Sequence, residues 1–235
     1  FYLPPTVFTH SIKSGIRSNT TSVSCVYKTS AVLNRRLYVG NVWQKADGRS
    51  VEKWYPDRML KSLPNRFDVL PDTEFIDVAI RDGEAIVRLA AFGNRLLQFK
   101  ENTMYVIALA GAEEYLESTF KNMGVRHPEA VIVTEQGVFW VNEFGAYTFQ
   151  GDKPPLNLID GRIDNAQWAD FITKDAIIGY NPKTKTLTVL GDSETSYTLD
   201  GSAIDAYYFN LITGSWNTGY GSIGDANHDK VTNFI

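Results

Sequence analysis

The chain has 235 residues, of which 43% are hydrophobic and 13% aromatic. This length suits one large all-β domain or two smaller domains, and the many Tyr, Phe and Trp residues favour strands. A formal net charge of −4 and a pI of about 5.4 argue against nucleic acid as the main partner, because phosphate binding needs clustered Lys and Arg.

Cys25 is the only cysteine, so no intrachain disulfide can form and the fold does not depend on an oxidising compartment. No segment reaches the ~18 consecutive apolar residues of a membrane span, and no basic region followed by an apolar stretch indicates a signal peptide. The chain begins with Phe1 and ends with Ile235, which leads us to expect a processed product or a piece of a longer chain.

The amino-terminal part begins with a predicted connector over residues 1–22, where Pro4-Pro5 stiffens a segment rich in Ser, Thr and Asn. Strand patterns then cover residues 22–27, 37–43 and 51–55. Residues 56–71 contain prolines at 56, 64 and 71, and we predict a long surface loop inserted there.

The central part is dominated by a predicted aromatic hairpin over residues 91–108, with a polar turn at 100–103. Strands at 75–80 and 85–89 precede it. Residues 111–124 are ambiguous: the spacing of Ala112, Leu116, Phe120 and Met123 slightly favours a helix over a strand through 115–121.

The carboxy-terminal part repeats the same features. A strand at 130–133 leads into a second aromatic hairpin at 137–149, in which we expect Gly145 to adopt a positive φ. A short helix capped by Asp164 is predicted within 162–172. A meander then follows, with strands at 177–180, 187–190, 197–199 and 206–209, and residues 219–230 form a loop.

Repetition of hairpins indicates the architecture. Leu37, Leu96, Val138 and Leu187 open successive hairpins at intervals of about 40 to 60 residues, and propeller blades recur at about 40 to 50. We therefore predict an all-β, propeller-like domain over residues 23–235, with repeated four-stranded antiparallel blades, about four in this chain. Propellers close with roughly four to eight blades, so we expect the segment to belong to a larger propeller protein.

No residue pattern predicts a catalytic, cofactor or metal site. His10, His127 and His228 stand on separate stretches without metal-binding spacing. Asp225, Asn227 and Asp229 match the start of a calcium loop, but Lys230 occupies the position that needs Gly, and we interpret the segment as an ordinary loop.

An acidic cluster supplies the enzymatic alternative. A glycosidase needs two carboxylates about 5 to 10 Å apart across a cleft, and carboxylates gather at Asp72, Glu74, Asp77, Asp82 and Glu84. Asp82 and Glu84 bracket a turn, and Glu74 and Asp77 should face opposite sides of a strand. We interpret all five as solvated strand ends.

Aromatic side chains supply a glycan-binding alternative. The candidates for a sugar-binding platform are Trp43, Trp54, Tyr55, Trp140, Trp168, Trp216 and Tyr220. Trp216 lies among turn residues and is the best exposed candidate, although packing in the core or at a rim is the favoured role for these side chains.

One segment resembles a known family. In it a DG-x-I-x-x-L strand precedes an L-L-x-F-K-E-N-x-x-Y hairpin and then a G-V-F-W…G-x-Y-x-F-x-G hairpin. The matching residues are Asp82, Gly83, Ile86, Leu89, Leu96, Leu97, Phe99–Asn102, Tyr105, Gly137–Trp140, Gly145, Tyr147, Phe149 and Gly151, with a further match at Asn34–Trp43. With these motifs, about two thirds of the chain resembles β-propeller-like virion proteins of tailed bacteriophages, of the tail nozzle and hub type.

The resemblance implies a structural tail protein that is not an enzyme and that binds other copies of itself and neighbouring tail proteins. It implies a place in the virion, after assembly in the cytoplasm of the bacterial host, and it favours a strand at 111–124. Our candidate interface residues are Arg58, Met59, Leu60, Arg66 and Phe67, in the predicted loop. The alternatives are a module that binds a host glycan or receptor, and a propeller glycosidase.

Overall fold

The computed structural model describes residues 7–12, 20–45, 53–67, 70–71, 74–78, 82–109, 114–191 and 204–219. The chain forms two compact units, Phe1–Val125 and Arg126–Ile235, and each is treated by itself. The predicted strand at 197–199 and the loop segment that contains Asp225, Asn227 and Asp229 lie outside the described residues.

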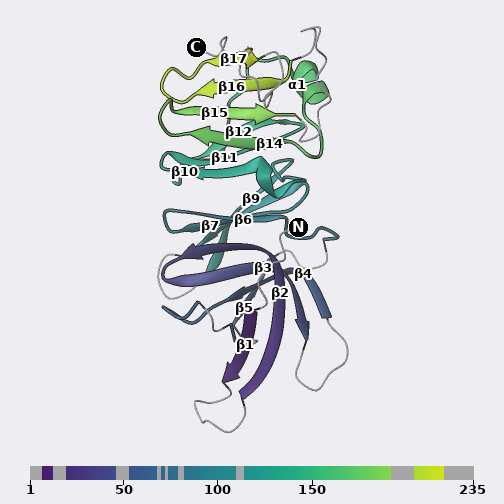
Figure 1. Ribbon diagram of the computed structural model, residues 1–235, viewed down its shortest axis with the longest axis vertical. Helices are drawn as coiled ribbons and strands as arrows, with labels where there is room; N and C mark the ends of the chain where they lie inside the picture. Colours follow the sequence, from purple (N-terminus) through teal and green to yellow (C-terminus); the bar gives the residue numbers. More distant parts are fainter. Residues whose placement is uncertain are drawn as a thin grey trace, which may run out of the picture. The chain divides into compact units, whose positions relative to one another are not determined.

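The first unit contains two antiparallel sheets (Figure 1). The first sheet has the order β1-β2-β3-β4-β5, with bounds Val7–Ile12, Thr20–Leu33, Arg36–Lys45, Lys53–Lys61 and Phe75–Asp77. The second has the order β6-β7-β8-β9, with bounds Arg88–Phe92, Arg95–Phe99, Thr103–Ala108 and Tyr115–Lys121. The aromatic hairpin predicted at 91–108 is confirmed as β7 and β8.

Two predictions for the first unit are wrong. Residues 7–12 lie in the predicted connector, yet they form β1, which pairs with β2. Residues 56–61 lie in the predicted loop, yet they belong to β4. Pro56 led to the prediction of a loop, but it occupies a bulge within β4. Residues 56–58 lie opposite Asn41 alone, between the pairs Tyr55↔Val42 and Met59↔Gly40. A bulge tolerates the missing backbone donor of proline.

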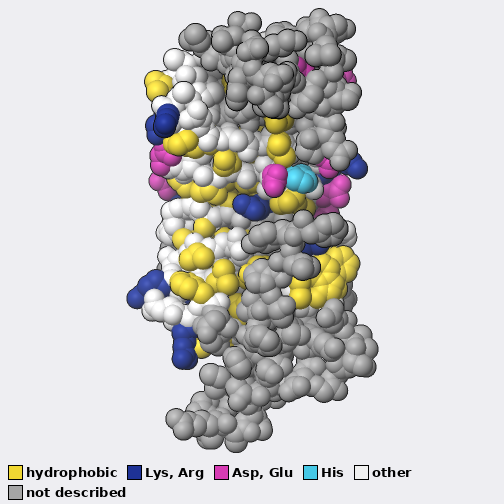
Figure 2. Space-filling model, in the orientation of Figure 1, with side chains coloured by type: hydrophobic (Ala, Val, Ile, Leu, Met, Phe, Trp, Pro, Cys, Tyr) yellow, Lys and Arg dark blue, Asp and Glu magenta, His cyan; other side chains and the backbone are white. Residues whose placement is uncertain are grey.

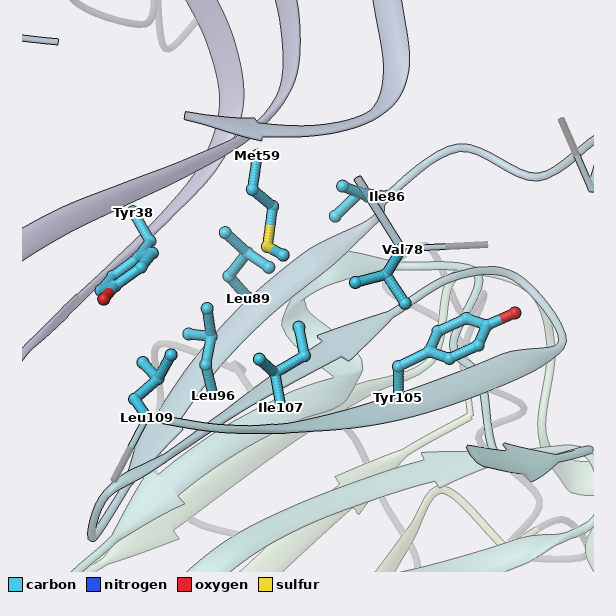
Figure 3. Packing of buried hydrophobic residues seen from close by; sticks show 9 residues of the cluster. All are labelled: Tyr38, Met59, Val78, Ile86, Leu89, Leu96, Tyr105, Ile107 and Leu109. Carbon is cyan, nitrogen blue, oxygen red and sulfur yellow. The ribbon is translucent and has the colours of Figure 1, made fainter. Parts of the chain in front are cut away.

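Apolar clusters lie on both faces of the first sheet around β3 and β4. Successive strand residues point to opposite faces, and Met59 and Leu60 accordingly belong to two separate clusters. Neither residue has any exposed surface. Figure 3 shows the larger cluster, in which Met59 and Tyr38 point towards Leu96 and Ile107 of the second sheet, with Leu89 between them. Apolar burial of this kind contributes about 25 cal/mol per Å².

Buried polar groups also join the two sheets of the first unit. The Thr29 hydroxyl accepts a hydrogen bond from the Leu89 amide at 2.9 Å, and Asn41 Nδ2 donates to the Ile86 carbonyl at 2.9 Å. Asn41 has a φ of 58°, a left-handed conformation that Asn adopts more readily than most residues. Gly40 beside it is closely packed, because a Cβ there would lie 3.2 Å from Ile86 and Leu89 side-chain carbons.

The ambiguous segment at 111–124 contains the strand β9, and the helix that the spacing favoured is wrong. Tyr105↔Thr119 and Thr103↔Lys121 pair β9 to β8. Tyr115 and Leu116 are about half exposed, so the helical spacing of apolar residues did not mark a buried helix face. Sheet pairing determined the outcome, as the family resemblance had implied.

The second unit contains two further sheets. The first has the order β10-β11-β12-β13, with bounds Val131–Thr134, Gly137–Asn142, Gly145–Phe149 and Leu156–Asn157. The second has the order β14-β15-β16-β17, with bounds Ile177–Asn181, Thr186–Leu190, Ala206–Asn210 and Trp216–Gly219. A short η1 turn (Pro128–Ala130) and the helix α1 (Asn165–Phe171) complete it.

Helix α1 confirms the predicted helix and its cap. The Asp164 carboxylate accepts from the amides of Ala166 and Gln167. The helix buries Trp168, whose Nε1 donates to the Asn142 carbonyl at 2.9 Å, while its ring packs 5.5 Å from that of Tyr207 on β16. One side chain thus joins both sheets of the unit.

A surface link also joins these two sheets. Glu135, in the β10–β11 turn, accepts hydrogen bonds from the Tyr180 hydroxyl at 2.7 Å and from the Lys185 ammonium. The hydrogen bond from Lys185, followed by that from Tyr180, lowers the pKa of Glu135 to about 2. Glu135 is exposed and both hydrogen bonds lie at the surface, so we assign this link little stability.

The expected positive φ at Gly145 is wrong. The chain reverses one step earlier, at Glu143–Phe144, where Asn142 Oδ1 accepts from the Phe144 and Gly145 amides at 2.9 and 3.2 Å. Gly145 begins β12. Its small size is needed for another reason, because a Cβ there would lie 2.7 Å from Asn157 Oδ1.

The fold is all-β and propeller-like. Four antiparallel sheets follow one another along the chain, each a meander of consecutive strands, as in propeller blades. Three have the predicted four strands and the first has five. The single domain over residues 23–235 stays a prediction, because two compact units can belong to one domain or to two. Among the described residues, no helix is long and apolar enough to cross a membrane.

Candidate functional site

Lys100 is the centre of an ion-pair network in the first unit. Its side chain has no exposed surface, and its ammonium lies 2.8 Å from both Asp82 carboxylate oxygens and 3.0 Å from Asp57 Oδ1. The Tyr105 hydroxyl donates to Asp82 Oδ2 at 3.2 Å. A buried ammonium is tolerated only when it is paired in this way.

A second contact fastens the same turn. Glu84 accepts hydrogen bonds from the Asn102 amide at 3.0 Å and from Asn102 Nδ2 at 2.7 Å. Asp82 and Glu84 therefore hold the turn between β7 and β8. The interpretation of these two carboxylates as merely solvated strand ends is wrong.

The position of Lys100 at the end of an apolar strand makes the network necessary. Phe99 and Lys100 are both fully buried, and the apolar β7 carries the ammonium into the interior. Asp57 reaches it from the β4 bulge. The network therefore connects the first sheet to the hairpin of the second.

Opposing effects act on the titration of the network. Burial raises the pKa of Asp82, but the hydrogen bond from Lys100, that from the Glu84 amide and the Lys100 charge outweigh burial and leave this pKa below its ordinary value of 3.8. Burial, followed by the negative charge of Asp82, raises the pKa of Tyr105.

The lowered pKa of Asp82 predicts a pH-dependent stability. A carboxylate whose pKa is lower in the folded state stabilises that state above its unfolded pKa, and this contribution disappears as the pH falls through the folded value. We expect Asp82→Asn to lower the free energy of unfolding at pH 7 and to lower it much less at about pH 3. Urea denaturation at both pH values measures this.

The exposed Asp170 of α1 provides the matched control, because Asp170→Asn removes a carboxylate at another surface. A stability difference between wild type and Asp82→Asn that is equal at both pH values would contradict the assignment.

A pocket of about 750 Å³ adjoins this network. Its walls come from the β4 bulge, from β5 and from the turn that carries Glu84. The side chains that matter for its chemistry are Lys53, Trp54, Tyr55, Arg58, Asp77 and Glu84.

Trp54 forms the aromatic edge of the pocket. Its ring stacks on Trp43 with centroids 5.6 Å apart and an interplanar angle of 14°. Its Nε1 donates to Asn41 Oδ1 at 2.7 Å. The residue is nevertheless 50% exposed, so the ring is fixed in orientation and still accessible to a ligand.

Arg58 forms the second aromatic element. Its guanidinium makes two hydrogen bonds to Asp77, at 3.0 and 2.8 Å, and lies 4.3 Å from the Tyr55 ring centroid and 4.0 Å from that of Phe75. A planar guanidinium is suited to both contacts. The hydrogen bond to Asp77 is the largest influence on Arg58 and raises its pKa.

The predicted interface residues separate into three groups. Arg58 lies in the pocket wall, whereas Met59 and Leu60 have no exposed surface and cannot contact a neighbouring subunit. Their selection was wrong because β4 was taken for a loop. Arg66 and Phe67 are exposed after a tight turn closed by the Leu63↔Arg66 bridge, and their role stays a prediction.

Trp216, the candidate ligand platform, packs within the second unit. Its Nε1 donates to the Leu158 carbonyl at 2.9 Å, and its ring lies 4.8 Å from Phe209 and 5.8 Å from Trp168. These contacts match the rim-packing role that the sequence favoured.

The other candidates have structural contacts or lie outside the described part. Glu74 lies 3.7 Å from Arg36 and 3.5 Å from Lys61. His127 caps η1, where its Nδ1 accepts from the Glu129 amide. The side chain of His10 and all of His228 are not among the described residues. Within the described ranges no group of three His, Cys, Asp or Glu side chains could hold a metal ion.

Comparisons with known proteins identify no family. No family model and no curated protein matches the chain. Among solved structures, Hsv2 of Kluyvelomyces marxianus aligns with a TM-score of 0.41 and 9% identity over 77% of this chain and 60% of that one. A putative 6-phosphogluconolactonase of Bacteroides uniformis aligns with a TM-score of 0.43 and 10% identity over 86% and 78%. The chain thus spans 60% of the length of Hsv2.

The sequence analysis named Trp54 and Tyr55 as glycan-binding candidates, but it did not bring them together with Asp77, Glu84 and Arg58 in one pocket. The signal available was the pairing of an aromatic run at Trp54-Tyr55 with the acidic residues that follow Phe75. The two segments were not placed side by side because Pro56 was taken as the start of a loop, and the pairing of β4 with β5 was therefore not predicted.

Proposed function

We propose that this chain is a structural component of a tailed-bacteriophage particle, a tail nozzle or hub protein without catalytic activity. It binds other copies of itself and neighbouring tail proteins, and it is assembled in the cytoplasm of the bacterial host. The observation that carries the proposal is the network around Lys100. Four residues that carry the family resemblance act together there with Asp57 and join the β7–β8 hairpin to the first sheet: Asp82, Lys100, Asn102 and Tyr105.

The chemistry of that network favours assembly over catalysis. The carboxylates of Asp82 and Glu84 are engaged with Lys100 and Asn102. A glycosidase would need one carboxylate to donate a proton and the other to act as a nucleophile or base. The lowered pKa of Asp82 is the opposite of what a general acid requires.

The surface of each unit offers apolar contacts. Figure 2 shows hydrophobic side chains that reach the surface in separate patches between charged ones. Large exposed hydrophobic residues occur in both units, including Val32, Phe67, Tyr115, Phe144 and Leu156. The aromatic members of this set, Phe67, Tyr115 and Phe144, are of the kind that commonly anchors protein interfaces.

The test targets the exposed turn after β4. We expect Arg66→Glu with Phe67→Ala to give a folded chain that does not enter particles, because it reverses a charge and removes an apolar anchor without affecting the core. Circular dichroism checks folding, and immunoblotting of purified particles measures incorporation.

Lys174→Glu with Ile212→Ala is the control, since it makes the same kinds of change at two exposed positions of the second unit. Normal incorporation of the Arg66/Phe67 variant would exclude this turn as a contact. Absence of the wild-type chain from purified particles would refute the proposed function.

A further inference from the structure

We propose that the pocket over the β4 bulge binds a neutral saccharide. The inference concerns a site that lies within the first unit. It does not rest on the proposed phage role, because it follows from the pocket walls alone.

The apolar side of the pocket is suited to the face of a sugar ring. Trp43 covers one face of Trp54, so the exposed half of Trp54 presents the other face. The hydrogen bond to Asn41 fixes its orientation. A pyranose packs its C–H groups against such a face, and a ring that is already held loses little conformational entropy on binding.

The polar side of the pocket offers acceptors and donors. Glu84 accepts two hydrogen bonds from Asn102, and a carboxylate can accept about four. Asp77 likewise accepts two from Arg58. Both carboxylates therefore keep acceptor capacity for ligand hydroxyl groups. Lys53 lies 4.8 Å over the Tyr55 ring and supplies donors.

The charge balance favours a neutral ligand. The cations Lys53 and Arg58 share the pocket with the carboxylates Asp57, Asp77 and Glu84, and Asp57 is paired with Lys100 behind the wall. Opposite charges so close together leave no strong net field for a phosphate or a sulfate. A nucleotide would stack on Trp54 but would bring its phosphates near Asp77 or Glu84. Neutral hydroxyl groups can use both kinds of partner.

The volume and the lining of the pocket also suit a small saccharide. A volume of about 750 Å³ is within the range of small-molecule sites, which combine aromatic walls with a few convergent polar groups. That volume accommodates a short oligosaccharide. We therefore expect recognition of a chain end or of a few units, with the first ring on Trp54.

The experiment uses the full chain and an array of neutral and acidic bacterial oligosaccharides, followed by titration calorimetry with the strongest neutral binder. We expect a Kd of about 1 mM or tighter, reduced at least tenfold in Trp54→Ala and severalfold in Glu84→Gln. Tyr115→Ala, which removes an exposed aromatic residue of β9 in the same unit, should bind as wild type does.

Circular dichroism of each variant separates lost binding from lost folding, and Trp54→Phe, which keeps an aromatic face, should retain most of the affinity. No binding by the folded wild-type chain would overturn the inference. Binding that survives Trp54→Ala, or binding of acidic saccharides only, would overturn it as well. None of these outcomes bears on incorporation into particles, which tests the proposed function.

Discussion

Replacing Lys100 by methionine is expected to lower the free energy of unfolding by about 3 kcal/mol, since removing one partner of a buried ion pair costs about 3 to 5 kcal/mol. The value should lie at the lower end because Asp57 and Asp82 keep 14% and 28% of their side-chain surface exposed. Methionine occupies a similar volume, so the loss in the free energy of unfolding measures the effect of removing the ammonium group. Urea denaturation at pH 7 measures it.

A second variant makes this prediction specific. In Lys100→Met with Asp82→Asn, the negative charge of Asp82 is removed together with the ammonium that balanced it, and the loss should be smaller than the sum of the two single losses. Lys121→Met, at an exposed position of β9, should change stability by less than about 0.5 kcal/mol. Additive effects of Lys100 and Asp82 would show that their contact carries no coupling energy.

Gly124→Ala is expected to have the other large effect. A Cβ at this buried position would lie 2.3 Å from the Lys100 carbonyl oxygen and 2.6 Å from the carbonyl carbons of Glu101 and Asn102. These are backbone atoms, so no side chain can rotate away. Overpacking usually costs about 1 to 3 kcal/mol, and we expect the upper end of this range or more.

Gly179→Ala is the matched control. This glycine lies in β14, and nothing stands within 4 Å of the position of its Cβ. Alanine there should be neutral or stabilise by up to about 1 kcal/mol, since it reduces the freedom of the unfolded chain. Thermal unfolding of both variants measures the effect. A Gly124→Ala variant with the wild-type midpoint would mean that Gly124 does not pack against the backbone of residues 100–102.

The sequence predicted the fold well where local signals agreed with sheet pairing. The hairpin over residues 91–108 had an apolar run on each side of a polar turn, and Asp164 had a suitable capping position. These signals depend on near neighbours along the chain. The predicted hairpin and helix cap are present in the structure because tertiary packing favours the same elements.

Prediction failed where long-range packing overruled a local signal. Pro56 indicated a loop, but pairing of β4 with β3 and β5 placed it in a bulge. The apolar spacing around Leu116 indicated a helix, but pairing with β8 produced a strand. Local propensity is a weak guide when sheet partners compete with it.

The candidate site could not be predicted for the same reason. Its walls bring together Trp54 and Asp77, which are far apart in sequence and meet only through the β4–β5 pairing. Lys100, Asp82 and Tyr105 belong to the motifs that carry the family resemblance, but the sequence did not show that they form an ion-pair network. Its members became interpretable once the bulge at Asp57 was placed beside the hairpin.

The meander order has a consequence for synthesis. Every pair of strands in the described residues joins chain neighbours, so each sheet can form its hydrogen bonds with little entropy lost to loop closure. A nascent chain can therefore complete one sheet while the next is still being translated. At any moment the nascent chain would expose the edge of one unfinished sheet, and this limits the time during which unpaired strands are open to aggregation.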